Sequence, residues 1–88
     1  MATQPLETER QARELPQVRA VNEAFDKDPG AGKMTPHNEA MLLAACASAG
    51  VAPGAYDLRI LRWLAGWEPE ICAVVAGLIT RAAEGKQG

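Results

Sequence analysis

Apolar residues recur at helical spacing in four segments of this chain, and turn-forming residues separate the segments. The pattern predicts four helices: one that begins near Pro16 and ends before residue 28, and three that span about 35–49, 56–65 and 68–85. Proline stands in the first turn of three of them, where its missing N–H has no helical partner to lose. Because no segment alternates between apolar and polar positions with a period of two, the sequence predicts an all-α fold.

The second predicted helix, 35–49, has apolar residues on most of its sides, so we expect other helices to cover it from more than one direction. One predicted face consists of Leu42, Ala45, Cys46 and Ala49, and the other of Ala40, Leu43, Ala44 and Ala47. Gly50 follows as a left-handed C-cap. In the last helix the predicted buried face is Ile71, Val74, Val75, Leu78 and Ala82, widened by Cys72, Ala76 and Ile79.

Residues 1–14 are mostly polar and charged, and Leu6 is their only large apolar residue after the initial Met1. They can bury too little surface to hold one conformation, so we expect a flexible tail. Glu9 and Arg13 could still pair one turn apart in a frayed helix. The rest of the chain, 15–85, is then a single domain, which we predict to be a small four-helix orthogonal bundle.

Composition indicates that the core of this domain is thin. Of the 88 residues, 48% are apolar, but alanine supplies 17 of these and Leu, Ile, Val and Phe together another 17. Alanine buries little area while it allows neighbouring helices to approach closely. The net charge of −2 offers no basic surplus to neutralise a phosphate backbone, so nucleic acid is not an expected partner.

Several features predict a cytoplasmic protein without a membrane span, metal or cofactor. Gly50, Pro53 and Gly54 interrupt the longest uncharged run well short of the ~20 apolar residues that a span needs. The N-terminal residues are too polar for a signal peptide. Cys46 and Cys72 lie in helical apolar patterns, without a second cysteine or a histidine at metal-ligand spacing. We therefore expect two buried thiols in place of a disulfide, redox or metal site.

The run Gly30-Ala31-Gly32-Lys33-Met34-Thr35 partly matches a phosphate-binding loop. Lys27 stands where the first glycine belongs, Met34 stands where the motif needs a hydroxyl residue, and the preceding element is a predicted helix instead of a strand. We therefore expect a turn between two helices. His37, the only histidine, has no neighbouring nucleophile or carboxylate pair, and the sequence predicts no catalytic residue.

The third and fourth predicted helices, joined by a tight turn at Gly66, resemble a helix-turn-helix unit. The residues at its expected buried positions are Leu61, Ala65, Trp67, Cys72 and Val75. Arg62, however, stands where a small residue normally lets the two helices cross. Glu68 and Glu70 begin the helix that would read DNA, where carboxylates repel phosphates. A DNA-binding regulator is therefore the alternative to the function favoured below.

Three of the four aromatic residues, Tyr56, Trp63 and Trp67, lie within twelve positions of one another. Trp63 and Trp67 are one helical turn apart, beside Arg59 and Arg62, and Trp, Tyr and Arg dominate the energetics of protein interfaces. The other interpretation is that the rings fill the core. For Trp67 the core interpretation is favoured. For Trp63 the two interpretations are equally supported.

Gly77 follows Ala73 by four positions in the last predicted helix, where glycine costs ~1 kcal/mol relative to alanine. This ridge of small residues predicts either close packing of another helix of the chain or a contact in a dimer. Close packing within the chain is the favoured interpretation.

Several stretches of the chain resemble small uncharacterised helical proteins of actinobacteria, often encoded beside phage-like or mobile-element genes. The stretches are 24–26 with 28–30, 32–34, 38–46 and 63–69. The resemblance covers about Leu15 to Ala83 and implies a free-standing small protein. It carries no assigned activity, and no functional residue follows from it.

Together these observations predict a non-enzymatic protein-interaction module. Its expected partner is another protein or a second copy of the chain. The expected contact residues are Arg59, Arg62, Trp63 and Trp67, and the Ala73–Gly77 ridge is a second candidate surface.

Overall fold

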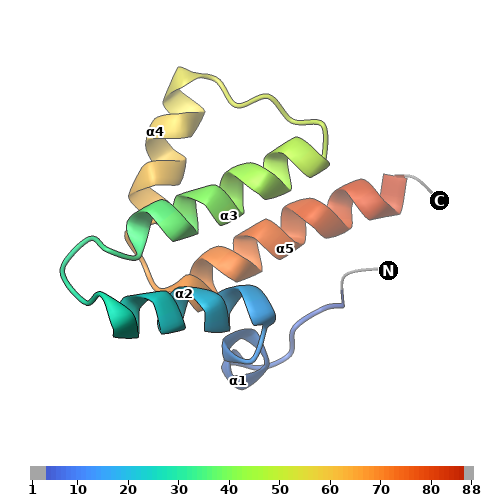
Figure 1. Ribbon diagram of the computed structural model, residues 1–88. Helices are drawn as coiled ribbons and strands as arrows, with labels where there is room; N and C mark the ends of the chain where they lie inside the picture. The colour runs from blue at the N-terminus through green and yellow to red at the C-terminus, as the bar shows by residue number, and fades with distance from the viewer. Residues whose placement is uncertain (1–3, 87–88) are drawn as a thin grey trace.

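The computed structural model describes residues 4–86, and every regular element in that part of the chain is a helix (Figure 1). The helices are α1 (Glu9–Arg13), α2 (Pro16–Lys27), α3 (Thr35–Ser48), α4 (Ala55–Leu64) and α5 (Pro69–Lys86). The all-α prediction is therefore confirmed. α3 and α5 run side by side through the middle of the molecule, α2 packs against both, and α4 stands steeply across the beginning of α3.

Helices α2 to α5 lie close to the four predicted segments, and the end of α3 shows why the prediction works. Gly50 has a φ of 75°, in the left-handed region that favours glycine. The N–H groups of Gly50 and Val51 donate to the carbonyls of Ala47 and Cys46 at 3.1 and 2.8 Å. These two bonds form a Schellman motif that satisfies carbonyls at the helix end, so the predicted C-cap at Gly50 is confirmed.

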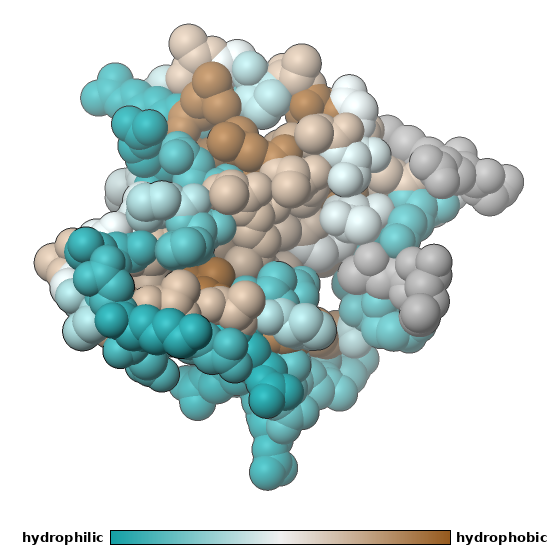
Figure 2. All heavy atoms as spheres, viewed as in Figure 1, coloured by the Kyte–Doolittle hydropathy of each residue, from teal (hydrophilic) through white to brown (hydrophobic). Residues whose placement is uncertain are grey.

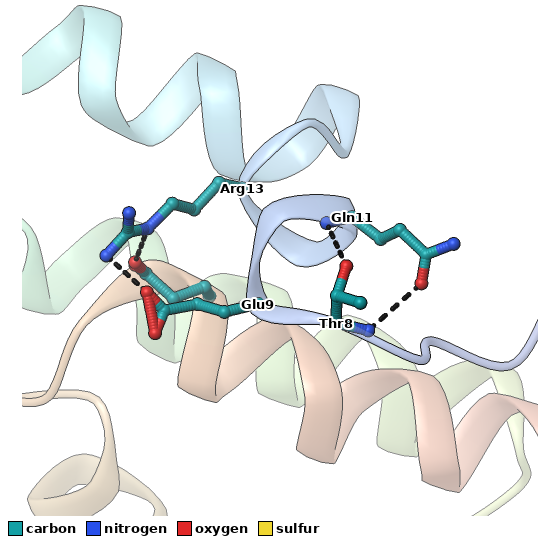
Figure 3. Close-up of polar contacts among 5 residues, drawn as sticks. Thr8, Glu9, Gln11 and Arg13 are labelled. Carbon is teal, nitrogen blue, oxygen red and sulfur yellow. Dashed lines mark hydrogen bonds and ion pairs between the residues drawn. The ribbon is translucent and has the colours of Figure 1, made fainter.

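The predicted number of helices is wrong, because α1 forms inside the segment that we expected to be a tail. Thr8 caps this short helix in a reciprocal pair of bonds (Figure 3). The Gln11 N–H donates to Thr8 Oγ1, and the Thr8 N–H donates to Gln11 Oε1, each at 3.1 Å. Ala12 is buried. Five residues are too few to form a stable helix alone, so packing against the rest of the chain must stabilise α1.

An ion pair joins α1 to the first turn of α5. Arg13 Nε donates to Glu70 Oε2 at 2.9 Å, and the same guanidinium also pairs with Glu9 on its own helix (Figure 3). The pKa of the Arg13 guanidinium is raised, mainly by its hydrogen bond to Glu70 and to a smaller extent by the negative charge of Glu9. The expected Glu9–Arg13 pair therefore forms, but in a helix that is also tied to α5.

The core lies between α3, α4 and α5 and is built mainly from small residues. Its buried members are Leu42, Ala45, Ala65, Cys72 and Ala76, with Met41, Leu61, Leu64, Val75 and Ile79 half-buried around them. The Cα atoms extend over 41 × 32 × 17 Å. Two helices whose axes pack ~8–10 Å apart, each with Cα atoms on a cylinder of ~2.3 Å radius, span roughly 13–15 Å between their outermost Cα atoms. A thickness of 17 Å therefore corresponds to about two layers of helices.

The buried face of α5 is rotated from the predicted one. Ile71, Val74 and Leu78 were expected in the core, but their exposed fractions are 38%, 39% and 54%. Cys72 and Ala76, which were expected to widen that face, are buried, and so is Ala73. Small side chains on this face let α3 and α5 approach closely, which leaves the larger residues at the edge of the contact.

The second predicted face of α3 is also mostly uncovered. Ala40, Ala44 and Ala47 are exposed, and Leu43 is half-buried. A shallow groove between α2, α3 and α5 runs past Ala40 and Ala44. The predicted face with Leu42, Ala45 and Cys46 is buried as expected, so other helices cover α3 mainly from that side.

Gly77 does not lie under a closely packed helix. A Cβ atom placed on Gly77 would meet no atom of the described chain within 4 Å. The favoured interpretation of the Ala73–Gly77 ridge is therefore wrong at Gly77, although Ala73 itself is buried.

Asn38 is the one buried polar residue within 4–86, and it fastens α3 to the turn between α4 and α5. Its Nδ2 donates to the carbonyls of Ala65 and Trp67 at 3.0 and 2.9 Å. Its Oδ1 is buried and accepts no hydrogen bond from the described residues. The amide orientation follows from this geometry, because a flipped amide would set its oxygen against two carbonyl oxygens.

We expect Asn38→Asp to lower the free energy of unfolding at pH 7 by about 3 kcal/mol or more, because it sets a buried carboxylate against two carbonyls. Such a carboxyl titrates with a raised pKa in the folded state, so the lost stability should return as the pH falls. Denaturant unfolding across pH measures both effects. The control is Asn22→Asp, at a half-buried position of α2. If both variants lost the same amount of unfolding free energy, the structural role assigned to the buried Asn38 amide would be contradicted.

Gly77→Ala should raise the free energy of unfolding by about 0.5–1 kcal/mol, because alanine is the better helix former and its Cβ enters open space. Gly50→Ala should lower it, since φ at Gly50 is 75°. Thermal unfolding of both variants beside the wild type measures the contrast. A loss of stability in Gly77→Ala would show that something packs on Gly77 after all.

Candidate functional site

Helix α4 presents an apolar surface that the rest of the chain does not cover. None of its ten residues is buried, although Leu61 and Leu64 pack around the core. Tyr56, Ile60 and Trp63 recur at helical spacing on its outer side, and Trp67 continues their line in the turn that follows. Their exposed fractions are 70%, 43%, 64% and 51%. We call these four residues the aromatic stripe.

The two tryptophans of the aromatic stripe contact each other at the surface. Their ring centroids are 5.9 Å apart, and their planes meet at 71°, the edge-to-face arrangement that aromatic pairs favour. The favoured interpretation of Trp67 as a core residue is therefore wrong. The buried core is formed by Leu42, Ala45, Ala65, Cys72 and Ala76, and neither tryptophan belongs to it.

Hydrophobic residues gather over α4 and α3 in the upper half of Figure 2, whereas α1 and α2 present mostly hydrophilic atoms on the same face. Beside Tyr56 and Ile60 lies a hollow of about 350 Å³, to which Val51 and Pro53 contribute. The apolar surface of α4 therefore extends onto the loop that precedes it.

Polar bonds hold α4 in place together with the packing of Leu61 and Leu64 on the core. Asn38 binds the carbonyls of Ala65 and Trp67, directly after the helix. The Cys72 thiol of α5 donates to the Leu64 carbonyl at 3.4 Å. At the start of the helix, the Gly54 N–H donates to Asp57 Oδ2 at 2.9 Å. These bonds fix the direction of α4 while its outer side stays exposed.

The structure separates the two predicted arginines. Arg62 Nε donates to Glu39 Oε2 of α3 at 3.1 Å, and the Glu39 side chain is mostly buried. Arg62 therefore belongs to the contact between α4 and α3, on the side away from the aromatic stripe. Arg59 is exposed one turn before Trp63, and no described carboxylate lies within 4 Å of it. It is the charged residue that borders the stripe.

Sequence reasoning singled out Trp63 and Trp67 and did not join Ile60 to them. Tyr56 was noted only as a nearby aromatic residue. The signal that could have joined all four is their spacing of i, i+4, i+7 and i+11, which marks one face of a helix.

The other sequence motifs show structural roles. The segment 28–34 connects α2 and α3, and within it Lys33 pairs with Asp28 at 3.1 Å. The N–H groups of Lys33 and Thr35 donate to the carbonyls of Gly30 and Gly32, so they do not point at a common anion. His37 is exposed. Within residues 4–86, no three His, Cys, Asp or Glu side chains are placed to hold a metal ion.

Comparisons with known proteins add no family to this geometry. No family model matches the chain, and no match was found to a curated protein or to a solved structure. The resemblance to actinobacterial helical proteins therefore stays a prediction. Over the described residues, the helices are too short or too polar to cross a bilayer.

Cys46 and Cys72 are free thiols, and both are buried, as the sequence predicts. Burial raises the pKa of the Cys72 thiol above its ordinary value. In the unfolded chain a thiol ionises near ~8.5, whereas Cys72 in the folded chain stays protonated to higher pH. The folded state therefore holds the proton more tightly, and this contribution to stability is complete below the unfolded pKa and is lost as the pH rises through the folded one.

The free energy of unfolding should accordingly fall more steeply between pH 8 and pH 10 in the wild type than in Cys72→Ala. Denaturant unfolding at several pH values measures the two slopes, and the titration of Lys and Tyr side chains cancels in the comparison. Parallel slopes would mean that the Cys72 thiolate is no more costly in the folded chain than in the unfolded one.

Proposed function

We propose that this protein is a non-enzymatic interaction module that binds a helix of another protein along the aromatic stripe. The observation that carries the proposal is the line of Tyr56, Ile60, Trp63 and Trp67, each of them substantially exposed. The first three lie on a helix without any buried residue, and Trp67 lies in the turn after it. Exposed apolar residues in a contiguous line are a feature of binding surfaces in small proteins. Docking of an amphipathic helix is a common way to cover such a line.

The exposed area of the aromatic stripe is large enough to supply a substantial part of an interface with a partner helix. With ~200 Å² for each fully exposed aromatic side chain, Tyr56, Trp63 and Trp67 offer roughly 400 Å². A standard interface buries about 800 Å² on each side, so the stripe would supply about half of it. Loop residues such as Val51, which is 50% exposed, extend the same surface.

Charge indicates the chemistry of the partner. Arg59 borders the stripe and has no ion pair within the described chain. A carboxylate on the partner helix would pair with it at the rim, where such pairs guide association and orientation. The proposed partner is therefore an amphipathic helix with an acidic residue beside its apolar face. We place the complex in the cytoplasm, where two free thiols stay reduced.

The alternative, a helix-turn-helix regulator, is less well supported. Such proteins insert the first turn of the second helix into the major groove. In this chain Pro69 is buried at that position, and Glu70 is engaged by Arg13 of α1. Glu68 is exposed beside them and would face phosphates. The first turn of α5 is therefore both covered and acidic.

In affinity capture from the source cells, a protein that binds the wild type should be absent or reduced with both Trp63→Ala and Arg59→Glu. Trp63 supplies a large part of the exposed stripe, so its loss should weaken binding by tenfold or more. Leu58→Ala is the control, because Leu58 lies on the same helix outside the stripe and is 42% exposed. The captured protein must then bind as a purified helical segment with an acidic residue, and it must shift the tryptophan emission to the blue.

Two results would contradict this function. The first is a set of captured proteins that is the same for wild type and Trp63→Ala. The second is a dimer in light scattering that Trp63→Ala converts to a monomer, which would make a second copy the occupant of the stripe. Circular dichroism of each variant checks that the helices are intact.

A further inference from the structure

A partly enclosed cavity lies between α5 and the residues on either side of α1. Its volume is about 350 Å³, at the lower end of the ~300–1,000 Å³ that is usual for small-molecule sites. Leu6 and Leu15 line one side of it, and Val74 and Leu78 of α5 line the other. None of the residues of the aromatic stripe contributes to it.

Arg81 is the only charged residue among the described residues that line this cavity. It is half-buried, and no described carboxylate lies within 4 Å of it. Arg10, Arg13 and Arg62, by contrast, are more exposed and each has an ion pair. A guanidinium that is partly removed from water and has no counter-charge is a strong site for an anion.

The lining positions of α5 are arranged along one face of the helix, with Arg81 at the end. Ala73 and Arg81 are separated by eight residues, or roughly 12 Å at ~1.5 Å per residue. This is close to the length of an extended chain of about ten carbons. Gly77 lies midway and lines the cavity, and a side chain there would enter open space.

We infer that this cavity binds an anionic amphiphile with a single acyl chain. The chain lies between Leu6 and Leu15 on one side and Val74 and Leu78 on the other, and the anionic head pairs with Arg81. Gly77 leaves the room that the chain occupies, which accounts for a glycine inside α5 at a cost of ~1 kcal/mol. This site is independent of the partner helix proposed for the aromatic stripe.

Calorimetric titration of the full chain with sodium decanoate, below its micelle-forming concentration, tests the site. We expect saturable binding that Arg81→Gln weakens by about tenfold or more, because a charge-assisted bond is lost. Arg19→Gln removes the same charge from α2, outside the cavity, and should leave binding unchanged. Gly77→Leu should abolish binding while the helical circular dichroism stays intact. Decyltrimethylammonium, with the opposite head charge, should bind at least about tenfold more weakly than decanoate.

Methyl NMR spectra locate the bound chain even if Gly77→Leu fails to fold. The methyl signals of Leu6, Leu15, Val74 and Leu78 should shift with decanoate, and those of Ile60 in the stripe should not. Equal affinity of Arg81→Gln and wild type, or shifts confined to the stripe, would overturn the inference. So would co-sedimentation with phosphatidylglycerol vesicles in the absence of decanoate binding, because the anion would then be recognised at a lipid surface. Trp63→Ala should keep its decanoate affinity, which separates this site from the proposed function.

Discussion

The side-chain amide of Asn38 determines where α4 lies. It donates to the carbonyls of Ala65 and Trp67, two groups that follow α4 and have no partner within that helix. The Cys72 thiol binds the Leu64 carbonyl from the other side. The turn between α4 and α5 is thus held by donors from both central helices, and a buried carbonyl without a donor would cost about 1–3 kcal/mol. Because no residue of α4 is fully buried, these bonds add to the partial packing of Leu61 and Leu64 on the core.

A core of small residues has consequences at the surface. Alanine, cysteine and one leucine fill the space between α3 and α5, so the helices lie close together and larger side chains are left outside. The same geometry exposes Trp63 on α4, Trp67 in the turn after α4, and Leu78 on α5. The exposure of these apolar residues therefore has one common structural cause. They are a result of tight packing between the central helices, and they line the two surfaces that we propose as binding sites.

The local elements could be predicted from sequence, and the faces they bury could not. Capping signals such as Gly50 act within a few residues, so they are visible in the sequence. The rotation of α5 depends on which residues meet α3, and small side chains offered no periodic signal stronger than that of Ile71 and Leu78. Trp67 was misplaced for the same reason, because its hydrophobicity outweighed its position at the edge of a turn. Asn38 carried a signal that was overlooked: an amide in the first turns of an otherwise apolar helix needs partners when it is buried.

The segment before Leu15 shows how a weak element can shape a site. α1 has only five residues, and it persists because a capping box, the buried Ala12 and the pair between Arg13 and Glu70 all act on it. Leu6 and Leu15 flank α1 and line the cavity over α5. The wall of that cavity is thus built on the least stable helix of the fold. A ligand bound there would be stabilised by α1 and would stabilise it in return, because binding and the ordering of the wall are thermodynamically linked. Loss of the Arg13–Glu70 pair would therefore affect the cavity before it affected the core between α3 and α5.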